Sequence, residues 1–329
     1  MQPLIDTYGR IANNLRISVT DRCNFRCRYC MPEEGMEWLK KGLLLSYEEI
    51  ERLVHIFASL GVTKIRLTGG EPLMRKELWK LVRMIRAIPA IRDIALTTNG
   101  YFLAEQVRLL RDAGLDRVNV SLDAMDPATF SSMVRRDQFA RTWEGIEAAI
   151  ECGLTPVKIN AVLIRGINDM EIEAFASLAR TRPVIVRFIE FMPIGLGDEW
   201  SPEQVIPSQE VIDRIGRISP LVPVDGANGS APAERYRFAD GKGEIGLISS
   251  VTQPFCNDCN RIRITSDGKF RTCLFSLTET DLRALLRRGS GDEEIAGVIT
   301  GAVARKEEGH LINRPGFVRP ERTMSRIGG

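Results

Sequence analysis

The chain has 329 residues, of which 44% are hydrophobic and 27% are charged, and its formal net charge is +2. This composition predicts a globular enzyme with a sizeable core, and the near balance of charge gives no reason to expect nucleic acid or a membrane surface as a partner. No stretch approaches the roughly 20 apolar residues of a membrane span, and the N-terminal residues lack the pattern of a signal or transit peptide, so we expect a cytoplasmic protein.

From residue 15 to about 191, short β-rich segments alternate with helical segments. The expected strands are 16–20, 64–69, 94–99, 117–123, 157–165 and 184–191. The expected helices are 47–60, 75–88, 104–113 and 170–180, and 126–152 is expected to be a helical region. Helix punctuation supports these limits, with Ser46 as an N-cap candidate and Gly61 and Gly114 as C-cap candidates. The alternation predicts a parallel α/β architecture with right-handed crossovers.

Each expected strand carries one apolar and one polar row, because residues two apart share a face. In the first strand Ile17 and Val19 alternate with Arg16 and Ser18. A sheet covered by helices on both faces should not show this pattern. We therefore expect an open partial (β/α)6 TIM-type barrel whose polar lumen holds a ligand. The alternative is a set of amphipathic surface strands.

A cysteine-rich loop follows the first expected strand, with Cys23, Cys27 and Cys30 in the spacing C-x3-C-x2-C. A flexible loop can wrap three such thiolates around one iron–sulfur cubane. Three ligands leave one iron open to a small chelating molecule. The alternative is a structural zinc site, which needs four ligands.

The second expected strand ends in the run Gly69-Gly70-Glu71-Pro72. Glycines at this point let the backbone come close to a ligand. The cysteine spacing followed by this run resembles the radical S-adenosylmethionine (SAM) superfamily. The resemblance implies that the open iron chelates SAM and that the backbone and carboxylate of this run hold the amino group of SAM.

Past residue 191 the alternation stops. We expect a connecting loop, a helix at 208–218, a mobile loop at 225–233, strands at 235–239, 244–249 and 261–265, a hairpin into 270–274, helices at 279–288 and 293–306, and an irregular basic tail. The expected division is a partial barrel over residues 1–192 and, over 193–329, a C-terminal β-hairpin and helical extension that covers the barrel mouth.

A second set of cysteines lies in the C-terminal part, at Cys256, Cys259 and Cys273. The hairpin can bring Cys273 back beside the other two, which again gives three ligands. A zinc knuckle is a stronger competitor here, because C-x2-C on a hairpin is common zinc geometry. The remaining Cys152 ends an apolar helix and is expected to be a small buried hydrophobic residue.

Both cysteine sets, the Gly-Gly-Glu-Pro run and the C-terminal Gly-Gly together resemble the GTP 3′,8-cyclase (MoaA) family of molybdenum cofactor biosynthesis, from about residue 16 to residue 329. The resemblance implies a lyase with two [4Fe-4S] clusters and SAM as cofactors. It implies that reductive cleavage of SAM gives a 5′-deoxyadenosyl radical that abstracts the 3′ hydrogen of GTP. Closure of C3′ onto C8 then gives 3′,8-cyclo-7,8-dihydro-GTP.

The same resemblance assigns roles to residues and names partners. It implies SAM-binding roles for Tyr29, Gly70, Ser121 and Met192, GTP-binding roles for Arg16, Arg66, Thr97, Lys158, Arg187, Arg261, Ile262 and Arg263, and catalytic roles for Gly328 and Gly329. The implied partners are GTP, an external electron donor and a downstream enzyme that forms cyclic pyranopterin, without nucleic acid or membrane. A homodimer is one option for the oligomeric state.

Charge supports the anionic part of this assignment independently. Arg16, Arg66, Lys158, Arg187, Arg261 and Arg263 lie on the polar faces of expected strands, where they would repel one another unless a polyanion lay between them. We also expect the tail, through Arg319, Arg322 and Arg326, to approach this lumen. The competing functions are a peptide-modifying radical SAM enzyme with an auxiliary cluster and a zinc-stapled module that binds nucleic acid.

Overall fold

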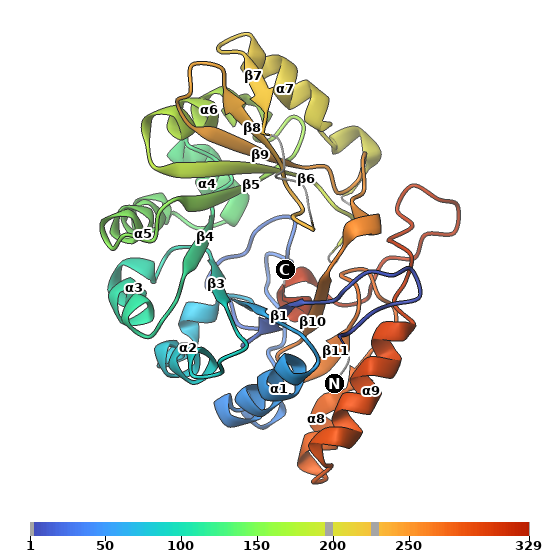
Figure 1. The fold of residues 1–329 in the computed structure, drawn as a ribbon. Helices are drawn as coiled ribbons and strands as arrows, with labels where there is room; N and C mark the ends of the chain where they lie inside the picture. The colour runs from blue at the N-terminus through green and yellow to red at the C-terminus, as the bar shows by residue number, and fades with distance from the viewer. Residues whose placement is uncertain (1–2, 195–199, 225–229, 329) are drawn as a thin grey trace.

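The computed structural model describes residues 3–194, 200–224 and 230–328, and one sheet of 12 strands runs through it (Figure 1). Its central strands run parallel in chain order and are β1 (Asn14–Ser18), β2 (Lys64–Thr68), β3 (Asp93–Thr98), β4 (Arg117–Ser121), β5 (Val157–Leu163) and β6 (Val184–Glu190). The expected parallel α/β architecture is confirmed. The sheet curves without closing, so the partial barrel is also confirmed.

Helices cover the outer face of these strands (Figure 1). They are α1 (Tyr47–Ser59), α2 (Leu78–Arg86), α3 (Leu103–Asp112), α4 (Pro127–Val134), α5 (Phe139–Glu151) and α6 (Ile172–Thr181). Ser46 is the expected N-cap of α1, and it forms a capping box with Glu49. Gly61 and Gly114 follow their helices with φ of 90° and 105°, which favours glycine there.

The helical region expected over 126–152 is confirmed, and it forms two helices, α4 and α5, with a break between them. Arg135 ends α4 in the left-handed conformation, with φ of 54°. The freed carbonyls of Val134 and Met133 accept hydrogen bonds from the amides of Arg26 and Arg28, each at 3.0 Å. The helix therefore ends where its last carbonyls bind the cysteine loop.

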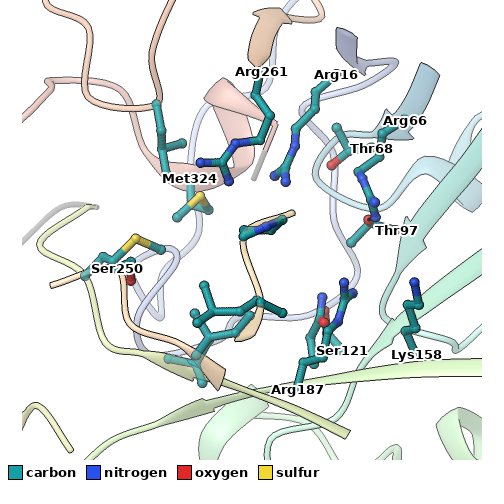
Figure 2. A pocket seen from close by; sticks show the side chains of 18 of the residues that line it. Arg16, Arg66, Thr68, Thr97, Ser121, Lys158, Arg187, Ser250, Arg261 and Met324 are labelled. Carbon is teal, nitrogen blue, oxygen red and sulfur yellow. Dashed lines mark hydrogen bonds between the residues drawn. The ribbon is translucent and has the colours of Figure 1, made fainter. Parts of the chain in front are cut away.

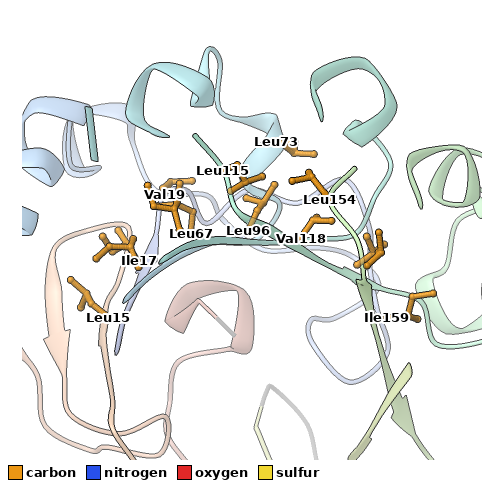
Figure 3. Close-up of a cluster of buried hydrophobic side chains, with 14 of the residues drawn as sticks. Leu15, Ile17, Val19, Leu67, Leu73, Leu96, Leu115, Val118, Leu154 and Ile159 are labelled. Atoms are coloured by element: carbon orange, nitrogen blue, oxygen red, sulfur yellow. The ribbon is translucent and has the colours of Figure 1, made fainter. Parts of the chain in front are cut away.

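The outer face of the sheet is apolar (Figure 3). Ile17, Leu67, Leu96 and Val118 are all 0% exposed and pack between the strands and the helices. Burying each of these side chains stabilises the fold by about 1.5–3 kcal/mol. The polar rows lie on the concave face, as the alternation predicts.

The C-terminal part extends the sheet at both edges. β9 (Glu244–Ile248) pairs in parallel with β6, and β10 (Arg261–Ile264) pairs in parallel with β1. Sequence reasoning predicted both strands but not these pairings. The expected hairpin forms between β10 and β11 (Lys269–Arg271), which are antiparallel.

The remaining elements are short or lie outside the barrel. They are β7 (Leu221–Pro223), β8 (Glu234–Phe238), β12 (Thr280–Asp281), α7 (Ser208–Gly216), α8 (Leu282–Arg287), α9 (Asp292–Ala304), α10 (Met324–Ile327) and 3-10 helices at Lys41–Leu43, Pro72–Met74, Asp169–Glu171, Pro202–Gln204 and Cys256–Asp258. Much of the loop expected at 225–233 lies outside the described residues. Among the helices of the described ranges, none is long and apolar enough to cross a bilayer.

The glycine pair after β2 packs against the backbone of the cysteine loop. The amide of Gly70 donates to the carbonyl of Thr20 at 2.7 Å, and the amide of Glu71 donates to the carbonyl of Arg22 at 2.7 Å. A Cβ at Gly70 would lie 2.3 Å from that Arg22 oxygen. Glycine is therefore required here because two backbone segments touch.

Gly70→Ala should lower the free energy of unfolding by about 1–3 kcal/mol, because the added methyl group forces the cysteine loop away from β2. Chemical denaturation followed by circular dichroism measures this change. Gly297→Ala is the matched control, since a Cβ at that exposed position in α9 would meet nothing within 4 Å beyond its chain neighbours and the adjacent backbone of its own helix. A Gly70→Ala protein as stable as the wild type would show that the loop tolerates a side chain.

Candidate active site

The concave face of the sheet holds a cavity of about 680 Å³. A volume of this size suits one or two small ligands. Residues of both halves of the chain line it, including all six cysteines of the two sets. The topology therefore brings together two motifs that lie more than 200 residues apart in the sequence.

The first cysteine loop is held rigidly at the C-terminal end of β1. Phe25 is buried within it and packs edge to face against Phe130 and Tyr101, with ring centroids 6.1 and 6.3 Å apart. The side-chain amide of Asn99, at the end of β3, lies 3.9 Å from the Cys23 sulfur. A preformed loop of this kind reduces the entropy lost when its thiolates bind a metal.

The chemistry of these thiols fits a positively charged metal group. Burial raises the pKa of Cys23 to about 12 and that of Cys30 to about 11, and it also raises the pKa of Cys27 well above its usual value. Thiols in such surroundings stay protonated unless a metal holds them as thiolates. All three are free cysteines. The donor set therefore fits an iron–sulfur cluster.

Cys259 of the second set meets a different electrostatic environment, whereas burial raises the pKa of Cys256 and of Cys273. Burial raises the pKa of Cys259, but Arg261 and then Lys306 outweigh this effect and lower the pKa to about 6. Both Nε and Nη2 of Arg261 lie 3.4 Å from the Cys259 sulfur. Cys259 is thus prepared as a thiolate before any metal arrives.

The three cysteine side chains of each set do not converge on one point. Within the described ranges, no three His, Cys, Asp or Glu side chains converge closely enough to hold one metal ion. A cubane does not require such convergence, because each of its irons takes a separate thiolate. Each set supplies three cysteines to the cavity, which is the number the sequence predicted for a cluster with one open iron.

The residues expected to bind SAM all line the cavity near the C-terminal ends of the strands. They are Tyr29, Gly70, Ser121 and Met192. The Tyr29 hydroxyl donates to Asp123 at 2.9 Å, and the amide of Val162 donates to the same carboxylate at 2.9 Å. Burial raises the pKa of Asp123 to about 6. Asp123 also lines the cavity, although sequence reasoning named it only as part of a strand end.

The carboxylate of Glu71 does not face this cavity, contrary to what the resemblance implied for it. Glu71 is 0% exposed, and its oxygens accept hydrogen bonds from the amides of Leu73 and Asn99 and from the hydroxyl of Thr98, at 2.7–2.9 Å. Burial raises its pKa to about 7. Glu71 therefore links the ends of β2 and β3 and positions the glycine run.

Three arginines form one row deeper in the barrel. Arg263 on β10, Arg16 on β1 and Arg66 on β2 are in register on adjacent parallel strands, so their side chains share the concave face. Neighbouring strands lie only about 5 Å apart. Figure 2 shows Arg16, Arg66, Arg187 and Arg261 arranged around the same open space, with Lys158 to the right of Arg187.

These cations lower one another's pKa. Burial and then Arg263 and Arg66 lower the pKa of Arg16 well below its usual value. Burial lowers the pKa of Arg263 and of Arg187 to about 9, with repulsion from Arg261 and Arg66 respectively. Burial and then Arg187 lower the pKa of Lys158 to about 8. These buried cations stay close together only because the rest of the fold offsets their mutual repulsion.

Several of the same side chains lack the hydrogen-bond partners that burial demands. Nε of Arg16, of Arg66 and of Arg187 is buried and has no partner among the described residues. Two of these guanidinium groups use only some of their N–H donors, since Arg66 donates to Thr97 at 3.2 Å and Arg187 donates to Asn119 at 2.7 Å. Unpaired guanidinium donors aimed into one cavity fit the oxygens of a polyphosphate.

Ile262 differs from the other expected GTP-binding residues. It lies between Arg261 and Arg263 in β10, and its side chain points into the hydrophobic core, where it is 0% exposed. Ile262 is not among the described residues that line the cavity. Thr97 and Lys158 do line the cavity, with Arg16, Arg66, Arg187, Arg261 and Arg263.

The tail enters the barrel through α10. The carbonyl of Gly328 accepts a hydrogen bond from Nη1 of Arg263 at 2.8 Å, and a Cβ at Gly328 would lie 2.8 Å from the Cβ of Ser18. Figure 1 shows the C-terminus inside the curve of the sheet. Gly329 lies outside the described residues. Gly328 is therefore packed against β1 and bound to β10.

The expectation that tail arginines face the lumen is wrong for the described structure. Arg322 pairs with Asp267 at 3.0 Å and with Glu279 at 2.7 Å, and Arg326 donates to the carbonyl of Glu37 at 2.6 Å. Arg319 donates to the carbonyl of Trp200. These contacts anchor the tail to the barrel rim, because each of the three guanidinium groups binds a residue that does not line the cavity.

Sequence reasoning missed His310 at the second cysteine set. His310 lines the cavity, its ring centroid lies 5.1 Å from that of Phe275, and its Nδ1 is buried without a partner among the described residues. It is one of two histidines, on a segment without regular structure. Its position in the sequence gave no signal of this location.

Comparisons with known proteins cover the whole of this site. The Radical SAM superfamily model matches residues 17–179, and the Molybdenum Cofactor Synthesis C model matches residues 184–312. The GTP 3′,8-cyclase of Pelotomaculum thermopropionicum is 50% identical over 98% of this chain and 99% of its own length. The chain belongs to the GTP 3′,8-cyclase family. The family members of Streptomyces coelicolor, at 47% identity, and Corynebacterium glutamicum strain R, at 45%, each match 99% of this chain and cover 96% and 89% of their own lengths.

Solved structures agree with the fold of this cyclase family member. SuiB of Streptococcus suis, solved with S-adenosylmethionine bound, has a TM-score of 0.60 to this chain at 13% identity. The match covers 95% of this chain and 78% of SuiB. At this identity the likeness concerns the fold alone.

Proposed function

We propose that this chain is a GTP 3′,8-cyclase, which forms 3′,8-cyclo-7,8-dihydro-GTP in the first step of molybdenum cofactor biosynthesis. One observation carries the proposal beyond family membership. Two sets of three cysteines line one cavity, and a row of in-register arginines lies in the same cavity. A redox centre, a second metal centre and a polyanion site then act on one substrate.

Two [4Fe-4S] clusters and SAM fit the residues present. Cys23, Cys27 and Cys30 would hold the first cluster, and a second set, Cys256, Cys259 and Cys273, would hold the other. When bound, these groups supply a 5′-deoxyadenosyl radical that removes the 3′ hydrogen of GTP. Ser121, Gly70 and Met192 would bind SAM, together with Tyr29, which the carboxylate of Asp123 orients.

The triphosphate of GTP supplies negative charge that neutralises the arginine row. Arg16, Arg66 and Arg263 present neighbouring guanidinium groups on one face. Arg187, Arg261 and Lys158 add charge around the same space, and Thr97 lies among them. The backbone of Ile262, which lies between Arg261 and Arg263 in β10, is proposed to complete the set. Fixing the triphosphate in this way orients the ribose and guanine between the two cysteine sets.

Gly328 and Gly329 are proposed to complete the site from the tail. A glycine chain occupies little volume, so it can approach both Arg263 and a bound nucleotide. The tail also restricts water, since Ile327 is 1% exposed and packs with Ile194 and Phe275. Exclusion of water strengthens the interactions between charged groups in the cavity.

The cellular setting follows from this chemistry. We propose a cytoplasmic enzyme that takes electrons from an external donor and passes its product to an enzyme that forms cyclic pyranopterin. The division proposed for the chain is a radical SAM barrel over residues 1–192 and an extension over 193–329 that carries the second cluster. A homodimer is compatible with this proposal.

Anaerobic turnover of GTP with SAM and a reductant tests the function, with detection of the cyclised nucleotide and of 5′-deoxyadenosine. The wild type should contain about eight irons per chain and form both products. Cys27→Ser should stop SAM cleavage, whereas Cys259→Ser should keep some cleavage without cyclised product. Cys152→Ala is the matched control, because Cys152 is buried in the core away from both sets. About one zinc per chain in place of iron would refute the proposal.

Arg263→Ala should weaken GTP binding far more than SAM binding. Loss of a charge-assisted hydrogen-bond partner costs about 1.5–3 kcal/mol, which is roughly ten- to a hundredfold in affinity. Anaerobic calorimetry with each ligand measures the difference. Arg288→Ala is the control, since that side chain is 60% exposed and pairs with Glu294 on the surface. Unchanged GTP affinity in Arg263→Ala would remove Arg263 from the nucleotide site.

Deletion of Gly328 and Gly329 should leave both clusters and some SAM cleavage in place while nearly abolishing cyclisation. The physical reason is that the Gly328 carbonyl is the partner of the Arg263 guanidinium, whose position then changes. Iron content, 5′-deoxyadenosine and cyclised product are measured on one sample. Product formed near the wild-type rate would make the two glycines dispensable.

A further inference from the structure

A buried lysine lies against the second cysteine set. Lys306 follows the end of α9 and is 4% exposed. Its ammonium donates to the carbonyls of Cys259 and Arg261, at 3.0 and 2.8 Å. The same Nζ lies 3.8 Å from the Cys259 sulfur. Two carbonyls therefore fix this charge beside one metal-binding thiol.

No carboxylate neutralises this ammonium in the parts of the chain that the structure describes. The adjacent carboxylate of Glu307 instead accepts hydrogen bonds from the hydroxyls of Thr272 and Ser276. A buried charge is costly unless an opposite charge lies close to it. The anionic group near this ammonium is the sulfur of Cys259, together with the cluster that this sulfur would bind.

Arg10 is the instructive comparison. It is also buried, and it donates to the carbonyls of Cys256 at 2.8 Å and of Glu308 at 2.6 Å. Its charge, however, is matched by Asp6 at 2.6 Å, and its recorded contacts at this loop are with carbonyls. Arg10 thus holds the loop in place, while Lys306 brings an unmatched charge to the sulfur.

Arg261 contacts the same sulfur but differs from Lys306 in its surroundings. Arg261 lines the cavity, and its contact with Cys259 can change when an anionic ligand binds. Lys306 is not among the described residues that line the cavity. Its charge beside the cluster is therefore independent of the substrate.

We propose that Lys306 is a positioning residue that sets the reduction potential of the second cluster. The inference rests on the proposed function, since it requires a cluster on Cys256, Cys259 and Cys273. Reduction adds negative charge to an iron–sulfur cluster, and a fixed cation that donates toward a ligand sulfur stabilises the reduced form. Lys306 thereby raises the midpoint potential of this cluster.

The test isolates the second cluster in a parent protein in which Cys23, Cys27 and Cys30 are replaced by serine. Redox titration followed by electron paramagnetic resonance then compares Lys306→Gln, Lys306→Arg and Arg10→Gln. Lys306→Gln should lower the midpoint potential, and Lys306→Arg should stay near the parent value. Arg10→Gln should give a smaller shift, because Asp6 already neutralises Arg10. An unchanged potential in Lys306→Gln, or an equal shift in Arg10→Gln, would overturn the role of Lys306.

A second measurement does not depend on the Lys306→Gln variant. The parent protein labelled with ¹⁵N-lysine should show a nitrogen coupling to the reduced cluster in pulsed resonance spectra, and Lys306→Arg should lack it. Absence of this coupling in the parent also overturns the inference. A parent without about four irons per chain instead overturns the second cluster itself, and the proposed function with it.

Discussion

Repulsion among buried cations is the constraint on which this structure depends. Arg263, Arg16 and Arg66 stand side by side on β10, β1 and β2, and backbone hydrogen bonds between the strands fix their spacing. Hydrophobic burial on the opposite face of the same strands provides the compensating stability, through residues such as Leu15, Ile17 and Leu67. Because side chains alternate along a strand, each of these strands joins a polar face with repelling charges to an apolar face that stabilises the fold. A ligand with several negative charges reduces this repulsion.

Charge is also distributed differently around the two cysteine sets. The first set is surrounded by groups that keep its thiols neutral, with the carboxylates of Glu71 and Asp123 adding to the effect of burial. In the second set, Arg261 and Lys306 lower the pKa of Cys259 to about 6, whereas burial raises the pKa of Cys256 and of Cys273. Two chemically similar clusters would therefore meet different charges within one cavity, and the difference lies at Cys259. This difference suits one centre that delivers an electron and another that binds part of the substrate.

Much of the fold and site could be predicted because the signals are local. Strand alternation predicted the two faces, and the cysteine spacings predicted both metal sets, since each depends on residues close in sequence. The break between α4 and α5 could not be predicted, because it depends on carbonyls of Met133 and Val134 that bind the distant cysteine loop. The partners of Arg322 and the orientation of Glu71 likewise depend on tertiary contacts that no spacing reveals. His310 and Lys306 became visible only when the fold brought them to the second cysteine set.

The pairing of β10 with β1 has a consequence for how the protein is made. The two strands are adjacent in the sheet, yet about 250 residues separate them in the chain. During synthesis β1 and β6 both present open edges until the C-terminal strands emerge, and open edges invite pairing with other chains. Contacts of such long sequence separation also form slowly. The nearly complete barrel, whose arginine row still lacks Arg263, must therefore be kept from pairing with other chains until the last third of the chain has been synthesised.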